Sequence, residues 1–281
     1  MPYVFILAVF ITWAVVLIRK SQLSWHSIIT IYAITVFTAD MLEVTFSLLL
    51  GFYKFLTHLS ANPFFENEFG IVLTDTMIFP FAFMVFVHYS RENRPWRTSL
   101  PFSIGFTVLE WSLVKFGYLM YLHWHIAFSA VFYIAAFRIY AYLAPRIMGS
   151  KPPIPYRTRL LCFSHTTIMW AGAVFSLPLL RMYQFRPGVF KDIMADCRFT
   201  DLLSGDVLSA ACAVFIPRAP NCLKPFIFAV IACIGAAFAL YSYSKGWLIY
   251  HQWNHFLTVL RYFVPLLLIM VYDKWEQGEN M

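Results

Sequence analysis

The chain has 281 residues, of which 60% are hydrophobic and 12% charged, about half the charge typical of a soluble domain. Long apolar runs separated by short basic loops indicate a polytopic membrane protein. The net charge of +7 arises in the loops, and the aromatic side chains lie within or at the ends of the apolar runs. This pattern argues against a nucleic-acid-binding protein.

Nine apolar segments are long enough, or nearly long enough, to cross a bilayer. In chain order they span residues 3–18, 27–50, 70–89, 99–116, 125–145, 159–180, 199–216, 223–243 and 255–272. The weakest is 199–216, because it contains Asp201 and Asp206. The predicted fold is therefore all-α, a polytopic transmembrane bundle of about nine helices.

Two stretches of the chain resemble each other. Residues 117–125 read GYLMYLHWH and residues 246–254 read GWLIYHQWN, so that Gly, Leu, Tyr and Trp recur at an offset of 129. Weaker matches pair Ser47 with Ser176 and Asp75 with Asp206. They predict two parallel four-helix repeats, 25–148 and 149–281, after an extra N-terminal helix in 1–24. Chance similarity between aromatic-rich membrane segments is the alternative.

The distribution of Lys and Arg predicts the orientation. Alternate loops hold most of the basic residues, namely Arg19, Lys20, Arg91, Arg94, Arg97, Arg146, Lys151, Arg157, Arg159, Arg218 and Lys224. The opposite loops hold Lys54, Lys115 and Lys245, and only the loop 181–198 departs from the bias. We therefore expect a multi-pass protein of the cell membrane with its N-terminus outside and its C-terminus in the cytoplasm.

The first half carries an ordered series of motifs. They are L-T-D-x3-F-P from Leu73, E-x4-K-x-G-x3-Y-x2-W-x4-S from Glu110, and then Arg138 and Pro145. Over about residues 1–145 the series resembles an uncharacterised family of five-helix membrane proteins of spore-forming Firmicutes, the CBO type. The resemblance implies the cytoplasmic membrane of a Gram-positive bacterium and no known activity. Offset 129 from Glu110 falls on Ala239, so the two repeats are not equivalent.

Ionisable side chains inside the apolar segments are the candidate site residues, because a central Asp or Arg costs about 2.5–3.5 kcal/mol in a bilayer. Asp40 and Glu43 form one helical stripe with Ser47. That stripe fits either a buried network that fixes helix packing or a transport or catalytic role. Asp75 and Glu110 are predicted to face one common cavity in the first repeat.

Arg261 lies seven residues into the last apolar segment and needs an anion. Asp206, at similar depth, is its predicted partner. Trp124 also fits an interfacial aromatic belt. The predicted substrate-binding residues, in the outer half of the membrane, are Asp40, Glu43, Asp75, Glu110, Tyr121, Trp124, Asp206 and Arg261.

Neither a metal site nor a cofactor is predicted. His251 and His255 are spaced i, i+4, but no carboxylate lies near them in sequence. The five cysteines form no C-x-x-C pair. The sequence also lacks a Gly-rich phosphate loop, a G-x-S-x-G motif and an H-E-x-x-H motif, which favours a protein that is not an enzyme.

Three classes of function fit these patterns. The leading prediction is a transporter or carrier of a small molecule or ion, supported by the parallel repeat and the buried acids. The second is a structural, accessory or sensor membrane protein, and the third is a membrane-embedded enzyme acting on a lipid or isoprenoid. The expected partners are membrane lipid and, for a carrier, its small-molecule or ion substrate.

Overall fold

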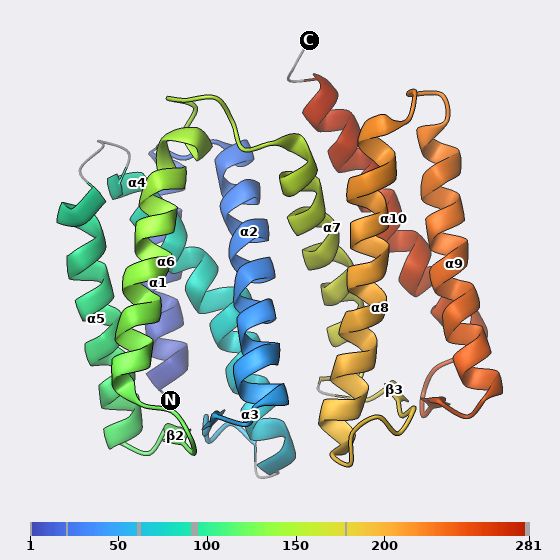
Figure 1. Cartoon of the computed structure of the whole chain (residues 1–281), viewed down its shortest axis with the longest axis horizontal. Helices are drawn as coiled ribbons and strands as arrows, with labels where there is room; N and C mark the ends of the chain where they lie inside the picture. Colours follow the sequence, from blue (N-terminus) through green and yellow to red (C-terminus); the bar gives the residue numbers. More distant parts are fainter. Residues whose placement is uncertain (1, 21, 61–62, 91–94, 178, 279–281) are drawn as a thin grey trace. The chain divides into compact units, whose positions relative to one another are not determined.

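The computed structural model describes residues 2–20, 22–60, 63–90, 95–177 and 179–278 (Figure 1). Arg91 and Arg94, two of the basic residues that predict the orientation, lie outside the described residues. The chain divides into two compact units, Met1–Ile154 and Pro155–Met281, here called unit 1 and unit 2.

The described part of unit 1 is built from five helices. The bounds are α1 (Pro2–Arg19), α2 (Trp25–Glu43) continued by the π-helical segment η1 (Val44–Leu49), α3 (Pro63–Leu73) continued by the π-helical segment η2 (Thr74–Ile78) and by α4 (Phe79–Ser90), α5 (Pro95–Lys115) and α6 (Ile126–Ile147).

The described part of unit 2 is built from four helices. They are α7 (Tyr156–Ala173), α8 (Ile193–Phe215) continued by the 3₁₀ segment η3 (Ile216–Arg218), α9 (Lys224–Ser244) and α10 (His255–Gly278). Over the residues with a described structure, the chain therefore forms an all-α bundle of nine continuous helices, as predicted. Seven of them are long and apolar enough to cross a membrane, and the more polar α5 and α7 are not among the seven.

Two helices begin at least six residues earlier than predicted, at Pro63 instead of residue 70 and at Ile193 instead of residue 199. In each, an acid in the first turns accepts hydrogen bonds from the preceding loop. Glu66 accepts the amides of residues 58 and 60 at 2.5 and 2.6 Å, and Asp196 accepts those of residues 188 and 189 at 2.8 and 2.7 Å. The segment predicted to be weakest thus belongs to a 26-residue helical span.

Each unit also holds a two-stranded antiparallel sheet, which the sequence analysis did not predict. In unit 1, β1 (Tyr53–Phe55) pairs with β2 (Leu119–Tyr121). In unit 2, β3 (Tyr183–Phe185) pairs with β4 (Leu248–Tyr250). The first residue of β1 faces the last of β2, and β3 and β4 pair in the same way. The most strongly repeated sequence therefore contributes a strand to each sheet.

The repeated glycines explain how each chain segment leaves its helix. Gly117 and Gly246 have φ of +75° and +72°, a conformation that glycine adopts without steric cost. The residue after each glycine donates its amide to the carbonyl five residues earlier, at 2.8 Å in both units. This pattern is a Schellman motif, and it ends α5 and α9 immediately before β2 and β4.

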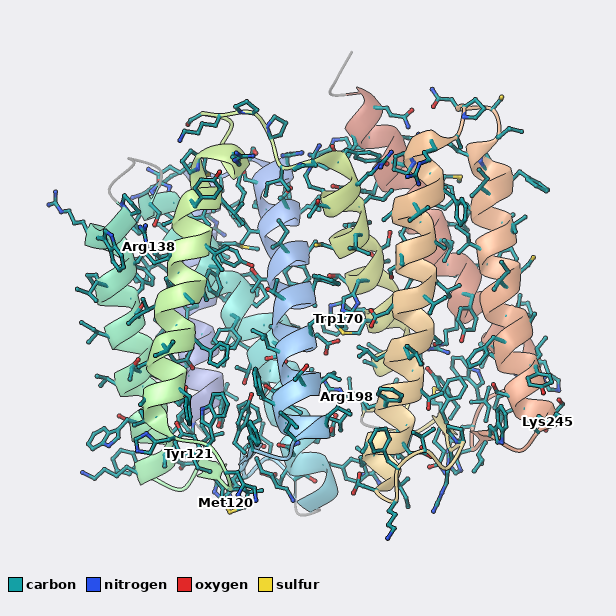
Figure 2. All side chains as sticks on the ribbon, viewed as in Figure 1. Met120, Tyr121, Arg138, Trp170, Arg198 and Lys245 are labelled. Atoms are coloured by element: carbon teal, nitrogen blue, oxygen red, sulfur yellow. The ribbon has the colours of Figure 1, made fainter. Side chains whose placement is uncertain are left out.

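The strands mark one end of unit 1, here called its strand end. A cluster of buried side chains from α1, β1, α3, η2 and β2 fills this end, namely Tyr3, Ile6, Phe55, Ile71, Ile78 and Leu119. The Tyr3 hydroxyl donates to the carbonyl of Tyr118 at 2.8 Å, so the start of α1 is fixed against the residue that precedes β2. Figure 2 shows Met120 and Tyr121 of β2 at this end.

Candidate functional site

A cavity of about 160 Å³ lies at the strand end of unit 1. Three helical segments each contribute one carboxylate to its wall: Glu43 from α2, Asp75 from η2 and Glu110 from α5. Their exposed fractions are 5%, 1% and 9%. The cavity therefore has three buried carboxylates that lie far apart in the sequence.

Glu110 is held by three hydroxyl groups. Its Oε1 accepts hydrogen bonds from Tyr121 and Ser129, and its Oε2 accepts one from Tyr133, each at 2.5 Å. Trp124 donates its indole Nε1–H to the Ser129 oxygen at 2.7 Å. Because every hydroxyl donor is neutral, this network orients the carboxylate without pairing it with a positive charge.

Glu43 accepts a hydrogen bond from the Tyr53 hydroxyl at 2.7 Å. Burial, and then the nearby Glu43 carboxylate, raise the pKa of Tyr53 well above its ordinary value. Burial and the hydrogen bond to Glu110 raise the pKa of Tyr121 in the same way. Both phenols therefore stay protonated at neutral pH and act as hydrogen-bond donors.

Aromatic rings form much of the rest of the wall. The lining includes Phe46, Phe55, Phe79, Phe106, Phe132, Trp124 and the tyrosines Tyr3, Tyr53 and Tyr133. None of the described lining residues is Lys, Arg or His. The cavity is thus acidic and aromatic, with no basic side chain on its described wall.

Both π-helical segments of the described chain reach this cavity. Phe46 of η1 and Thr74, Asp75 and Ile78 of η2 line it, while the described part of unit 2 has no π-helical segment. Such segments often mark functional sites, because they break the regular hydrogen bonding of a helix.

Three other predicted site residues of unit 1 lie on or near the cavity. Trp124 lines it, and Tyr121 reaches it through the hydrogen bond to Glu110. Asp40 is buried at 2% exposure on α2 but does not belong to the lining. Five of the eight predicted residues are therefore gathered at the strand end of unit 1 by the cavity and its hydrogen bonds: Glu43, Asp75, Glu110, Tyr121 and Trp124.

The predicted pair of Arg261 with Asp206 is wrong. Arg261 forms its ion pair with Asp201, five residues before Asp206 on α8. Asp206 instead bonds the Nδ1 atom of His165 at 2.6 Å and is 29% exposed at its side chain. Similar depth on one helix did not identify the partner, because five residues turn a helix by about 140°.

Aromatic side chains surround the Arg261 guanidinium. Its carbon lies 5.1 Å from the ring centroid of Tyr183, 5.8 Å from that of Phe185 and 4.8 Å from that of Tyr262. Arg261 also donates to the Tyr262 hydroxyl at 2.8 Å. Unit 2 thus holds a buried cation between a carboxylate and aromatic rings.

The residues around this guanidinium correspond in sequence to residues of the unit 1 cavity. At an offset of 129 or 130, Tyr183 follows Tyr53, and Tyr262 follows Tyr133. The Tyr53 hydroxyl donates to Glu43, and the Tyr183 hydroxyl donates at 3.0 Å to the carbonyl of Gly172. Gly172 is the counterpart of Glu43 at the offset of 129. Corresponding tyrosines thus contact corresponding positions of α2 and α7.

Unit 2 lacks two of the three cavity carboxylates. At the same offset, Gly172 takes the place of Glu43, Ala239 that of Glu110, and Arg261 that of Phe132. A Cβ atom on Gly172 would lie 2.9 Å from the Arg261 guanidinium. The guanidinium therefore lies against the position that corresponds to Glu43.

Unit 2 has a cavity of another kind. Its volume is about 390 Å³, and it is lined by apolar, aromatic and hydroxyl side chains of α8 and α9 together with residues of the β3 loop and Trp247. None of its described lining residues is charged. Within the described residues, no three His, Cys, Asp or Glu side chains converge as metal ligands would.

Several residues of the site were missed in the sequence. Tyr53 lies between two predicted apolar segments and Tyr133 lies within one, so neither a charge nor a spacing marked these tyrosines. Asp201 was noted only as a charge that weakens the segment 199–216, because Asp206 was the predicted partner of Arg261. The offset of 129 or 130 links Tyr53 with Tyr183 and Tyr133 with Tyr262, and this repeated tyrosine was the available signal.

Comparison of the chain with protein-family models, with curated proteins and with solved structures finds no match. The resemblance to the five-helix family of spore-forming Firmicutes therefore stays a prediction.

Proposed function

We propose that the chain is a multi-pass protein of the cytoplasmic membrane that binds a small ligand in the cavity of unit 1 and carries it across the bilayer. One observation carries this proposal: three buried carboxylates from three helical segments line a cavity whose described wall has no Lys, Arg or His side chain. Buried acids are costly in a membrane, and they mark substrate and ion paths. The two π-helical segments on the wall give further support.

We also infer that the four helices of unit 2 and the four continuous helices of unit 1 from α2 to α6 are copies of one four-helix repeat, with α1 as the extra N-terminal helix. The support is the shared strand register, with Tyr53 opposite Tyr121 and Tyr183 opposite Tyr250. Each helix-ending glycine, Gly117 and Gly246, has the same hydrogen-bond pattern. Because each copy has an even number of helices, the two copies should have the same orientation in the membrane.

The proposed orientation has the N-terminus outside, which puts the strand end and the cavity in the outer half of the membrane. The basic residues of alternate loops support it. Arg159 and Lys224 are buried and pair with Glu276 and Asp273 at 2.8 and 3.0 Å, but the orientation rule counts Lys and Arg and gives acids little weight. Reporter fusions after Met281 should report the cytoplasm, and fusions in the loop 52–69 should report the outside.

The carrier function is tested in liposomes that contain the purified chain. They are incubated with an isotope-labelled bacterial cell extract, and the compounds retained in the lumen are identified by mass spectrometry. We expect one class of compound to accumulate with the wild-type chain and not with Glu110→Gln. Asp206→Asn is the matched control, because Asp206 lies in unit 2 and bonds His165. Equal retention by wild type and Glu110→Gln would refute the proposed carrier site.

A membrane-embedded enzyme acting on lipid is the second candidate. Leu42 of α2 and Phe132 of α6 line the cavity and are 45% and 39% exposed, so the cavity reaches the surface of the bundle beside them. A lipid substrate would enter there from the bilayer. Incubation of the purified chain with membrane lipids, followed by mass spectrometry of the lipids, distinguishes this candidate, since an enzyme produces a new mass and a carrier does not.

A further inference from the structure

We propose that the ligand of the unit 1 cavity is an organic cation with an ammonium or guanidinium group. This inference rests on the proposed function of unit 1 as a ligand-binding unit and adds the chemical class of the ligand. Two observations carry it, the composition of the cavity wall and the cation that unit 2 already holds.

Charge is the first argument. Glu43, Asp75 and Glu110 line one cavity, and no described lining residue is basic. The hydroxyl groups that donate to Glu43 and Glu110 are neutral. Carboxylates in an apolar surrounding favour a positively charged partner, so a cation is the ligand that best complements this wall.

The aromatic wall is the second argument, because a cation is attracted to the face of an aromatic ring within about 6 Å. Tyr53 and Trp124 line the cavity together, with ring centroids 5.6 Å apart. Phe132 adds a third ring, 5.8 Å from Trp124. Aromatic rings on the wall beside carboxylates suit an alkylated ammonium or a guanidinium group.

Unit 2 supplies the third argument. There a guanidinium is held by Asp201 and lies over the rings of Tyr183 and Tyr262, the counterparts of Tyr53 and Tyr133 in the repeat. Arg261 therefore acts as a tethered ligand in the position that a free cation would take in unit 1. Unit 1 has Phe132 at the corresponding position, so its cavity stays open.

Size and ligand geometry favour an organic cation over a metal ion. A cavity of roughly 150 Å³ accepts a molecule of the size of benzene, and the unit 1 cavity has about 160 Å³. Its three carboxylates do not converge into a described cluster with metal-ligand geometry. They come from three separate helical segments, α2, η2 and α5, and such an arrangement can contact different N–H donors or substituents of one group.

The test is calorimetric titration of the purified full chain in a detergent with an uncharged headgroup. The probes are guanidinium chloride at low millimolar concentration and tetramethylammonium chloride, with urea as the neutral molecule of guanidinium shape. We expect at least one cation to bind, and urea to bind weaker by about tenfold or more. Equal binding of urea and guanidinium would overturn the role of charge.

Two variants place the binding in the cavity. Glu110→Gln keeps the shape and removes one charge, and we expect about a tenfold loss of cation affinity or more. Phe132→Arg introduces into unit 1 the tethered guanidinium of unit 2, and we expect it to abolish binding. Phe132→Leu is the matched control, because it removes the same ring without adding a charge, and size-exclusion chromatography with a thermal melt checks that each variant is folded. Cation binding that survives both Glu110→Gln and Phe132→Arg would overturn the proposed site.

The cation has two possible sources, a free solute or the headgroup of a zwitterionic lipid. Tetramethylammonium titrations in nanodiscs of phosphatidylcholine and of an uncharged glycolipid separate them, because neither surface carries a net charge that attracts the probe. Weaker apparent binding in phosphatidylcholine identifies the headgroup as the competitor, and equal binding identifies a free solute. If no cation binds but the liposome assay still retains a neutral or anionic compound, this inference fails while the carrier proposal stands. If the liposome assay also retains nothing, both fail.

Discussion

Unit 1 and unit 2 have the same arrangement of strands and helix ends, but they treat buried charge in opposite ways. In unit 2 three acids of the helices pair with bases: Asp201 with Arg261, Asp273 with Lys224 and Glu276 with Arg159. In unit 1 the carboxylates Glu43 and Glu110 accept hydrogen bonds from hydroxyl groups beside a cavity. One scaffold thus holds a neutralised core in one unit and an acidic site in the other.

This difference indicates that the buried charges of unit 2 serve stability and those of unit 1 serve binding. Neutralised pairs fix helices at little net cost or gain, although they are costly to break. The acids of unit 1 accept from neutral donors, so these hydrogen bonds bring no positive charge into the cavity. Unit 2 therefore fits a supporting role, and unit 1 is the unit in which we expect binding.

The largest effect should follow from breaking the pair of Arg261 with Asp201. Arg261→Gln leaves the Asp201 carboxylate without its positive partner, and we expect it to lower the free energy of unfolding by about 3–5 kcal/mol. The measurement is denaturation in mixed detergent micelles. In a double-mutant cycle, Arg261→Gln with Asp201→Asn should cost less than the sum of the single changes.

Asp206→Asn is the control for that cycle. Because Asp206 bonds His165, its loss should add to that of Arg261→Gln within the error of the method. If the cycle couples Arg261 to Asp206 and not to Asp201, the partner predicted from the sequence is the right one. Arg261 and Asp201 then do not represent a bound cation in unit 2.

A smaller loss is expected from Glu110→Gln in unit 1. The amide presents one acceptor oxygen where the carboxylate presents two, and three hydroxyl groups donate to that carboxylate. Hydrogen bonds to charged groups contribute about 1.5–3 kcal/mol, and we expect a loss of this size in the same denaturation assay. A bound cation should raise the melting temperature of the wild type and leave that of Glu110→Gln nearly unchanged.

The third test concerns how tightly the ion pair of Arg261 and Asp201 packs against Gly172 in unit 2. A Cβ atom on Gly172 would lie 2.9 Å from both Arg261 and Asp201, so Gly172→Ala forces the ion pair to move. We expect a loss of about 1–3 kcal/mol, as for other overpacked cores. Gly205→Ala on α8 is the control, because its Cβ would meet Ile168 at 3.4 Å, and alanine there should gain about 0.5–1 kcal/mol. Equal effects of the two changes would show that the guanidinium does not fill this position.

The all-α bundle could be predicted from the sequence because nine apolar segments dominate its composition. The starts of two helices could not, since they depend on Glu66 and Asp196 binding loop amides that lie near them only after folding. The strands have three residues each, which is too short for alternation to mark them. Their sequence stood out only because it is repeated.

The acids of the site could be predicted for a physical reason: a charge inside an apolar segment needs a partner or a ligand. Which partner it has depends on the face of the helix and on neighbouring helices, which one sequence does not give. Asp206 was therefore predicted as the partner of Arg261 from its depth alone, whereas Arg261 pairs with Asp201 in the structure. Tyr133 and Ser129 were not predicted as site residues, because hydroxyl groups in membrane helices usually satisfy backbone or neighbouring groups. The repeat marks Tyr133, and the motif from Glu110 ends on Ser129, but neither signal indicates a bond to Glu110.

The smallest effects test whether the two units are copies of one repeat. Gly117→Ala and Gly246→Ala each place a side chain at φ near +75° and +72°, and a Cβ atom at either position meets nothing within 4 Å. Backbone strain is therefore the whole cost, about 1–2 kcal/mol for each change. Because both glycines end a helix before a strand with the same hydrogen bonds, the two losses should agree within about 0.5 kcal/mol and should add in the double variant. Denaturation in mixed micelles measures both. A clearly larger loss at Gly117 would mean that this turn also positions Leu119, which lines the cavity of unit 1. In that case cation affinity should fall in Gly117→Ala and stay unchanged in Gly246→Ala.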